Sequence, residues 1–305
     1  MLIEAMAKDL RLPSAYIESV IGSASHAYKT YQVPKRTKGF RTIHHPSRPL
    51  KALQRWMLTN IISKFPVHSA AMAYQKGCSI LKNAAAHSDS QYLLRMDFEN
   101  FFPSIKEAHI HAYLQVAKTQ TPELFGWTSD DENVFLRIVL RKSALTIGAP
   151  TSPGLSNAIC YELDSRISTL CNARRVSYTR YADDLFFSTK LRGVLKSIET
   201  EVESLVAGLA LPDGLSINKA KTRHYSKKNS RRVTGIVLGS DSKAYVGRDL
   251  KRKVRAMIHK YATLDPSERA SLSGLISYVM GFDPDFINSL IKKYNLPAVQ
   301  QARLK

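Results

Sequence analysis

The stretch SYTRYADDLFFS (177–188) places two adjacent aspartates, Asp183 and Asp184, between two segments that read as β-strands. Charge repulsion and the cost of removing carboxylates from water both oppose such an arrangement beside apolar residues. Aspartate is common in turns, so ordinary turn chemistry is the simplest interpretation of the pair. A third acid, Asp97, ends the apolar run YLLRM (92–96) and favours a second interpretation, in which the acids act together.

Asp97, Asp183 and Asp184 meet at one edge if both of their segments belong to the same sheet. Magnesium is a hard cation that prefers carboxylate, water and phosphate oxygens. Two such ions about 3.5–4 Å apart stabilise the attacking and leaving oxygens of a phosphoryl transfer. Their charge also removes the repulsion between the acids. The constellation therefore predicts metal-dependent phosphoryl transfer with two Mg²⁺ ions, against the alternative of a plain turn.

The charge of the chain indicates its partners. The 305 residues include 45 Lys and Arg against 25 Asp and Glu, a net charge of +20. Nucleic acid and anionic membranes are the usual partners of such a surface. The sequence has no apolar run of the roughly 18–20 residues that span a bilayer, and its first residues do not resemble a signal peptide. We therefore expect a nucleic-acid partner and no membrane.

The cysteines and the order of elements add further expectations. Cys78, Cys160 and Cys171 suit neither a disulfide framework nor a paired zinc site, so we expect a cytoplasmic protein with reduced thiols. The order strand–helix–strand–strand–helix–strand between about 91 and 238 predicts an α+β fold with a ferredoxin-like antiparallel sheet. The expected segments are a basic hairpin at 28–56, helices at 50–65, 79–87 and 195–210, strands at 91–102, 214–226 and 231–239, and a basic amphipathic helix from 248. The segment 143–170 is expected to begin as a loop and to continue as an amphipathic helix.

Five blocks of the sequence resemble the reverse transcriptases. YADD (181–184) resembles their YxDD box, and the other four blocks occur in the order of that family. Two short motifs, NAAAH (83–87) and VTG (233–235), resemble signatures of bacterial retron reverse transcriptases. The resemblance covers roughly residues 28–240, and the four further blocks are KGFRTIHHPSRPLKALQ (38–54), LLRMDFENFFPSI (93–105), GAPTSPGLSNAI (148–159) and GLSINKAKT (214–222).

The resemblance implies a right-hand polymerase with fingers, palm and thumb. It also implies RNA-directed DNA synthesis on a structured non-coding RNA of the msr-msd type, primed from a 2′-hydroxyl to give a branched RNA–DNA product (msDNA). Retrons resemble anti-phage defence systems with a separate effector protein. The expected divisions are an N-terminal helical segment (1–30), fingers (31–92), a palm (93–240) with an interleaved fingers segment (about 106–145), and a basic helical thumb (241–305).

The resemblance also assigns roles to individual residues. Asp97, Asp183 and Asp184 are expected to be the catalytic acids and the metal ligands, with Asp97 and Asp183 bridging both ions and Asp184 in a supporting role. Phe102 occupies the position of a steric gate that excludes a ribose 2′-hydroxyl. The residues expected to bind the incoming dNTP are Arg41, Lys38, Phe102 and Lys221, with Lys35 as a weaker candidate.

RNA contacts are expected from two parts of the chain. One is formed by the two retron-type motifs, and the other is the basic face of the helix after 248, which can follow phosphates. The sequence departs from the family at Ile147, where many relatives have glutamine, which leaves that polar contact in doubt. The expected RNA-binding residues are Asn83, His87, Val233, Thr234, Gly235, Arg252 and Arg255.

Three other functions remain as alternatives. A group II intron or diversity-generating reverse transcriptase shares the main blocks, but the two short motifs favour the retron type. A non-catalytic RNA-binding scaffold would not need all three acids. A hydrolase has little support, because GLSNA (154–158) is not the GxSxG motif and the pairs His44/His45 and His109/His111 lack a metal-ligand context.

Overall fold

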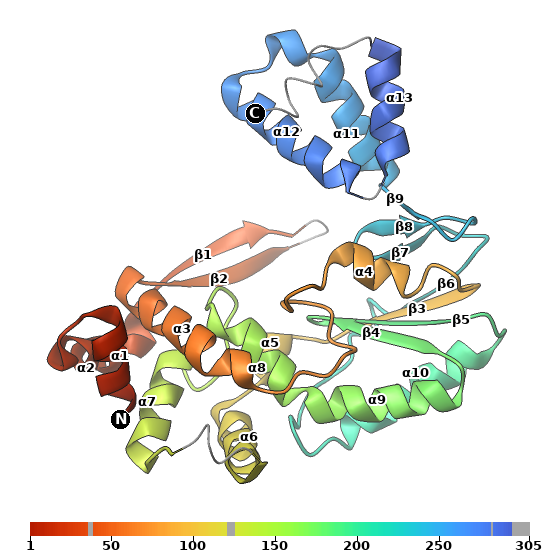
Figure 1. Ribbon diagram of the computed structural model, residues 1–305. Helices are drawn as coiled ribbons and strands as arrows, with labels where there is room; N and C mark the ends of the chain where they lie inside the picture. Colours follow the sequence, from red (N-terminus) through yellow and green to blue (C-terminus); the bar gives the residue numbers. More distant parts are fainter. Residues whose placement is uncertain (36–38, 121–125, 282, 295–305) are drawn as a thin grey trace.

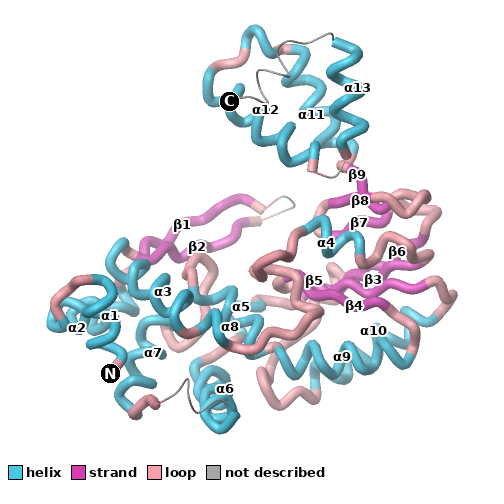
Figure 2. The backbone as a smooth tube through the Cα atoms, in the orientation of Figure 1, coloured by secondary structure: helices cyan, strands magenta, loops and turns pink. Residues whose placement is uncertain are grey.

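The computed structural model describes residues 1–35, 39–120, 126–281 and 283–294. Its central element is a four-stranded antiparallel sheet with the order β4-β5-β3-β6 (Figures 1 and 2). These strands are β3 (Tyr92–Asp97), β4 (Ser177–Tyr181), β5 (Asp184–Thr189) and β6 (Arg223–Ser226). With helices between β3 and β4 and between β5 and β6, this order is that of a ferredoxin-like sheet, which confirms the predicted fold class.

Alternation along the strands divides the sheet into two buried faces. Leu94, Met96, Leu185 and Phe187 point to one side and join the main hydrophobic core. The helices α9 (Tyr161–Ala173) and α10 (Val194–Ala207) pack against this side (Figure 1). Because successive side chains of a strand point to opposite faces, the acids at the strand ends lie on the other side from this core.

The second face of the sheet is covered by a short helix and a small sheet. Leu93 and Phe186 from the central sheet pack with Ala84, Val233 and Ile236 in a separate cluster. These partners belong to α4 (Ile80–Ala85), β7 (Arg231–Val233) and β8 (Ile236–Leu238), and β9 (Ala244–Tyr245) pairs with β8. Residues about 100 positions apart in the sequence thus meet on the face that carries the acids.

A helical layer with one hairpin completes the N-terminal half. Its helices share the main core with the central sheet. The hairpin of β1 (Tyr28–Pro34) and β2 (Phe40–Pro46) extends from this layer with mostly exposed side chains (Figure 2). The helices are α1 (Leu2–Leu10), α2 (Ser14–Gly22), η1 (Ala24–His26), α3 (Arg48–Asn60), η2 (Ile62–Lys64), α5 (Phe101–Ser104), α6 (Glu107–Gln120), α7 (Ser129–Val139) and α8 (Thr151–Ile159).

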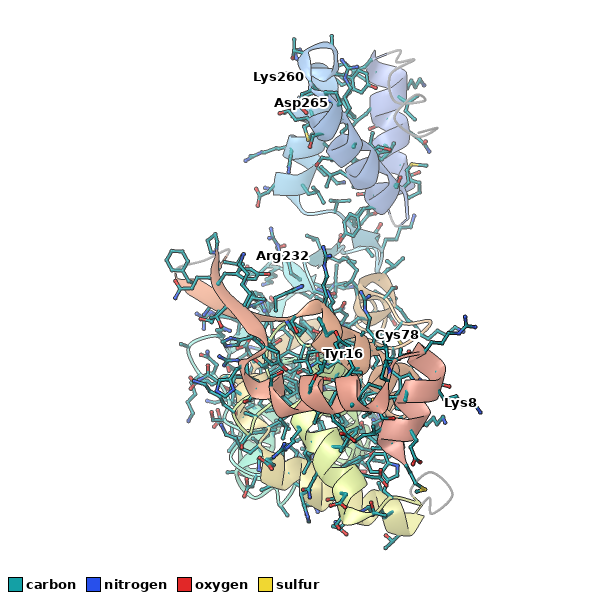
Figure 3. All side chains as sticks on the ribbon, turned by 90° about the vertical axis from the view of Figure 1, so that its left-hand side faces the viewer. Lys8, Tyr16, Cys78, Arg232, Lys260 and Asp265 are labelled. Carbon is teal, nitrogen blue, oxygen red and sulfur yellow. The ribbon has the colours of Figure 1, made fainter. Side chains whose placement is uncertain are left out.

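The C-terminal helices have a hydrophobic core of their own. They are α11 (Arg248–His259), η4 (Tyr261–Thr263), α12 (Pro266–Met280) and α13 (Pro284–Tyr294). Val254 and Ile258 are buried in this core, with Met257 and Tyr261 packed against it, so the predicted apolar face of the helix after 248 is confirmed. Figure 3 shows Lys260 and Asp265 toward the end of this unit away from the sheets. Among the residues that the structure describes, none of the helices is long and apolar enough to cross a membrane.

Several predicted segments differ from the observed elements. The strand predicted at 91–102 ends at Asp97 and is followed by α5, and the hairpin predicted at 28–56 ends at Pro46, before α3. The segment 231–239 is not one strand but a hairpin, because Thr234 and Gly235 both have positive φ angles of 47° and 88°, the pattern of a tight two-residue turn. The helix predicted within 143–170 is broken at Cys160 into α8 and α9. Only the last four residues of 214–226 form a strand, since the preceding part runs as a loop under the end of β3, where the Asn218 N–H donates to the Asp97 carbonyl at 2.7 Å.

Candidate active site

Three acidic side chains meet at the end of the central sheet, as the sequence predicts. Asp97, the last residue of β3, lies directly opposite Asp184, the first residue of β5. Asp183 belongs to the two-residue turn between β4 and β5, and its carbonyl accepts the Phe98 N–H at 3.0 Å. The adjacent Ala182 has a φ of 58°, a left-handed conformation that is uncommon for a residue with a side chain. The turn is therefore a specific structure fixed between two strands of the sheet.

Two cations pair with two of the acids. The Lys221 ammonium lies 2.6 Å from Oδ1 of Asp97, whose side chain is only 4% exposed. Arg95, two residues before Asp97 on the same face of β3, donates from Nε and Nη2 to Oδ1 of Asp184 at 3.0 and 2.8 Å. These charge-assisted bonds fix the orientation of both carboxylates. The three acids are therefore unequal in their surroundings, although two are adjacent in sequence.

The electrostatic environment of Asp183 and Asp184 disfavours their charged forms. Burial raises the pKa of Asp184 to about 6, although the Arg95 guanidinium acts in the opposite direction. Burial also raises the pKa of Asp183, and the charge of Asp97 adds to this effect, whereas Lys221 and Arg41 oppose it. Partly buried carboxylates close to one another respond in this way because each charge is poorly solvated. The arrangement is suited to a bound positive charge.

The donors at this edge fit a hard divalent cation. Asp97 and Asp183 provide carboxylate oxygens, the ligands that Mg²⁺ prefers together with water and phosphate oxygens. Within the described ranges, no group of three His, Cys, Asp or Glu side chains is arranged as a complete metal-binding cluster. Asp184 is instead engaged by Arg95. A metal ion here would take carboxylate oxygens from Asp97 and Asp183 and further ligands from water and substrate.

Some of the other residues predicted to bind the nucleotide lie near the acids. Arg41 is exposed on β2, and its charge reaches Asp183. Phe102 on α5 is half-buried, with its ring 5.4 Å from that of Phe101. Lys35 is exposed on the hairpin, whereas Lys38 lies outside the described residues.

The loop before α8 is tied to the hairpin through its backbone. The Ile147 carbonyl accepts the His44 N–H of β2 at 2.8 Å. Gly148 has a φ of 112°, and a Cβ at this position would lie 2.5 Å from the His44 carbonyl oxygen. Only glycine allows so close an approach. The unusual Ile147 therefore keeps a structural contact that depends on the backbone, whatever its side chain does.

The structure corrects the expectation that Asn83, His87 and Val233 contact RNA with their side chains. All three are buried, with exposures of 0%, 1% and 0%. The His87 ring is hydrogen-bonded to the hydroxyls of Ser188 at 2.8 Å and Thr179 at 2.7 Å, and Thr179 also donates to Asn83 at 2.6 Å. Asn83 and His87 thus fasten the helix α4 to the central sheet. The NAAAH pattern by itself did not reveal this, because the partner hydroxyls lie far away in the sequence.

The remaining predicted RNA-binding residues have varied surroundings. Thr234 and Gly235 form the turn between β7 and β8, and the Thr234 hydroxyl donates to the Ile80 carbonyl at 3.3 Å. Arg252 and Arg255 are exposed on α11. Figure 3 shows Arg232 of β7 on the side of the molecule toward the C-terminal helices. Exposed basic groups are thus available on α11 and on β7.

Three residues near the acids escaped the sequence analysis. Arg95 orients Asp184, and Arg180, on β4, is completely buried next to the turn. Tyr74 has a φ of 61°, and its side chain is partly buried, with 54% of its surface exposed. This partial burial raises the pKa of Tyr74, as does the neighbouring charge of Asp183. A basic residue inside an apolar strand was the available signal for both arginines. Nothing in the local sequence marked Tyr74.

Comparison with known proteins identifies the family of this chain. Residues 33–238 match the family model described as reverse transcriptase (RNA-dependent DNA polymerase). The chain is 34% identical to the retron Ec83 reverse transcriptase of Escherichia coli, over 92% of this chain and 90% of that protein. It is 32% identical to the retron Ec86 reverse transcriptase of the same species, over 98% and 92% of the two chains.

A solved structure shares the fold. The foamy viral protease-reverse transcriptase in complex with double-stranded DNA superposes with a TM-score of 0.51 at 17% identity. The match covers 88% of this chain but only 38% of that one, so it supports the fold alone. The family model and the retron relatives span the YADD turn and the strand that ends in Asp97. The chain belongs to the retron-type reverse transcriptases, and it is an RNA-directed DNA polymerase.

Proposed function

We propose that this enzyme copies part of a cognate structured non-coding RNA into single-stranded DNA, primed from an RNA 2′-hydroxyl to give a branched RNA–DNA product. The observation that carries the proposal is the similarity to retron reverse transcriptases over more than nine tenths of the chain, together with three acids at one end of the sheet. The proposal includes a role in anti-phage defence with a separate effector protein, in the bacterial cytoplasm.

Asp97 and Asp183 are the proposed ligands of two Mg²⁺ ions. Reverse transcriptases as a family use divalent metal ions, and the carboxylates at this edge fit such ions. When bound, the ions would activate the priming hydroxyl and stabilise the charge that develops on the leaving pyrophosphate. Asp184, held by Arg95, is the supporting acid that adds negative charge to the site. In this proposal the two adjacent aspartates differ in role, with Asp183 as a metal ligand and Asp184 as a supporting acid.

The surrounding side chains orient the incoming dNTP in this proposal. Arg41 binds its triphosphate, because a guanidinium donates two parallel hydrogen bonds to phosphate oxygens. Lys221 reaches the same region from its position beside Asp97. Phe102 lies under the sugar and leaves no room for a 2′-hydroxyl, and Lys38 is a further proposed ligand of the dNTP.

The C-terminal helices are proposed to hold the RNA and the RNA–DNA product. Arg252 and Arg255 are exposed on α11, while the apolar side of this helix is buried in its own core. An A-form duplex presents a wide, shallow minor groove that a protein recognises by shape and by contacts to phosphates and 2′-hydroxyls. In this proposal residues 31–92 form the fingers, 93–240 the palm with a fingers segment at about 106–145, and 241–305 the thumb.

Expression with the native locus tests the proposal directly. We expect a short branched single-stranded DNA in cells that carry the wild-type gene, sensitive to a debranching nuclease. The Asp183→Ala variant is expected to produce none while it accumulates to the same level. A branched DNA that persists with Asp183→Ala would refute the assignment of the active site. A linear product without a branch would refute the priming from a 2′-hydroxyl.

A further inference from the structure

A buried arginine lies beside the turn that carries the acids. Arg180 of β4 has no exposed surface, and neither has Asp164 of α9. The two form a bidentate pair, with Nε 2.8 Å from Oδ1 and Nη2 2.6 Å from Oδ2. The Tyr178 hydroxyl also donates to Asp164 at 2.8 Å. A buried ion pair of this kind is weak evidence for stability, because desolvation offsets much of its attraction, so another role must be considered.

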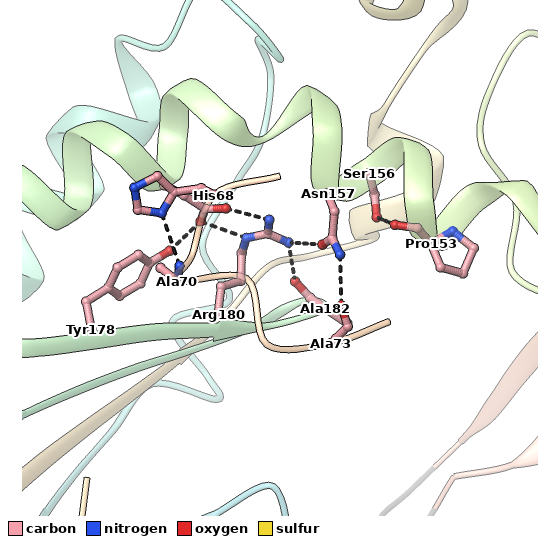
Figure 4. Close-up of polar contacts among 10 residues, drawn as sticks. His68, Ala70, Ala73, Pro153, Ser156, Asn157, Tyr178, Arg180 and Ala182 are labelled. Carbon is pink, nitrogen blue, oxygen red and sulfur yellow. Dashed lines mark hydrogen bonds and ion pairs between the residues drawn. The ribbon is translucent and has the colours of Figure 1, made fainter. Parts of the chain in front are cut away.

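The third nitrogen of Arg180 bonds to the turn itself. Nη1 donates to the Ala182 carbonyl at 3.2 Å and to Oδ1 of Asn157 at 3.2 Å (Figure 4). Ala182 is the residue with the left-handed backbone, and Asp183 follows it directly. A backbone in this region costs about 1–3 kcal/mol and persists only where its surroundings fix it. The bond from Arg180 to the Ala182 carbonyl is such a restraint.

The same network reaches a second segment next to the acids. Nδ2 of Asn157 donates to the Ala73 carbonyl at 2.8 Å, as Figure 4 shows. The backbone of Arg180 also accepts a bond from Met72 and donates one to Ala70, both at 2.7 Å. Tyr74, whose backbone is left-handed, comes directly after this anchored stretch. One side chain thus connects α8, α9, the aspartate turn and the segment that presents Tyr74.

We propose that Arg180 is a positioning residue that holds the Ala182–Asp183 turn and, through Asn157, the Ala73–Tyr74 segment in the geometry that nucleotide addition requires. The inference rests on the proposed role of Asp183 as a catalytic acid. A guanidinium suits this task because its planar fork binds Asp164 with two donors and leaves a third directed at the turn. Lysine keeps the charge but cannot make these bonds together.

A triple variant tests the proposal without leaving a buried charge unpaired. Arg180→Met, Asp164→Leu and Tyr178→Phe together replace the polar network by apolar groups of similar size, a change that proteins often tolerate. We expect kcat for single-nucleotide extension to fall 10- to 100-fold. The Kd for the RNA template–primer is expected to stay within twofold of the wild-type value, since the surface that binds RNA is unchanged. The single variant Arg180→Lys is expected to recover less than a tenth of the difference in kcat between the triple variant and the wild-type protein.

The matched control is Arg231→Met. Among the residues that the structure describes, Arg231 of β7 is the other fully buried arginine, and it donates to the carbonyls of Ser90 and Gly239 away from the turn. At a temperature where both proteins are folded, we expect this variant to keep its kcat. A folded triple variant with wild-type kcat, or a loss in Arg231→Met as large as in the triple variant, would overturn the proposal.

Two further variants keep the test decisive. If the triple variant does not fold, Asn157→Leu replaces it, with an expected fall in kcat of at least fivefold at unchanged Kd; an unchanged kcat would count against the network. Asp183→Asn is measured in parallel, and its inactivity supports the assignment on which the inference rests. An active Asp183→Asn would refute the proposed site, whereas an inactive Asp183→Asn beside a fully active triple variant would refute only the role of Arg180.

Discussion

The strongest structural prediction concerns His87, which the sequence placed among RNA-binding residues and the structure places inside the protein. The perturbation is His87→Leu, which removes the ring nitrogens but keeps an apolar side chain. Burial lowers the pKa of His87 to about 3, so the ring is neutral near pH 7 and the substitution removes no charge. What is lost is a pair of hydrogen bonds, to Ser188 and Thr179.

The magnitude follows from these two bonds. Each buried hydrogen bond contributes about 0.5–1.5 kcal/mol, and a buried hydroxyl that loses its partner costs about 1–3 kcal/mol. Thr179 keeps its bond to Asn83, so the main loss falls on Ser188. We expect the free energy of unfolding to fall by about 2–4 kcal/mol. At roughly 2–4 °C per kcal/mol for a domain of this size class, Tm should drop by about 4–16 °C.

Two assays on the same protein distinguish a structural role from an RNA contact. Thermal unfolding measures stability, and equilibrium binding at a temperature well below Tm measures RNA affinity. We expect His87→Leu to lose stability with RNA affinity within twofold of the wild-type value. The double variant Arg252→Ala/Arg255→Ala is expected to show the reverse, with unchanged Tm and a salt dependence of binding reduced by about one unit per arginine.

A second substitution checks the assignment to Ser188. In the His87→Leu background, Ser188→Ala removes the hydroxyl that has lost its partner, so it should cost less stability than in the wild-type protein. Lys82→Ala, an exposed change on α4, should alter stability by no more than about 0.5 kcal/mol. The reasoning is refuted if His87→Leu weakens RNA binding tenfold or more while Tm stays the same.

The remaining predictions concern the active site. Because burial raises the pKa of Asp184 to about 6, its carboxylate gains a proton as the pH falls through this value, and kcat should decline on the acid side. Arg95→Met removes the positive charge that lowers the pKa of Asp184, so the acid limb of the pH profile should move to higher pH. An unchanged pH profile would contradict this. Phe102→Ala should raise ribonucleotide incorporation in primer extension, and unchanged sugar discrimination would remove the gate role. Gly148→Ala places a Cβ 2.5 Å from the His44 carbonyl oxygen, so backbone strain of about 1–3 kcal/mol should lower Tm and raise KM for dNTPs. Wild-type values of Tm and KM would show that the loop moves to accommodate the methyl group.

The sequence was sufficient for features that depend on local pattern. β-Forming and apolar residues predicted strands at 91–102 and on both sides of the YADD turn, and the order of the elements predicted one sheet. The structure pairs these strands, and their ends bring Asp97 and Asp184 together. The apolar spacing after 248 likewise predicted the buried side of α11. Local pattern was insufficient at 231–239, where the β-branched and apolar residues favour a strand but Thr234 and Gly235 turn the chain back.

The tertiary structure decided which polar residues face substrate and which hold the protein together. Asn83 and His87 are buried because Thr179 and Ser188, about 100 residues away, supply their partners. Asp183 and Asp184 differ because only Asp184 is within reach of Arg95. The sequence was enough to single out the three acids, because the pattern of the strands that carry them is local. Their inequality, and the burial of the retron-type motif, arise from contacts between distant segments, which no local spacing encodes.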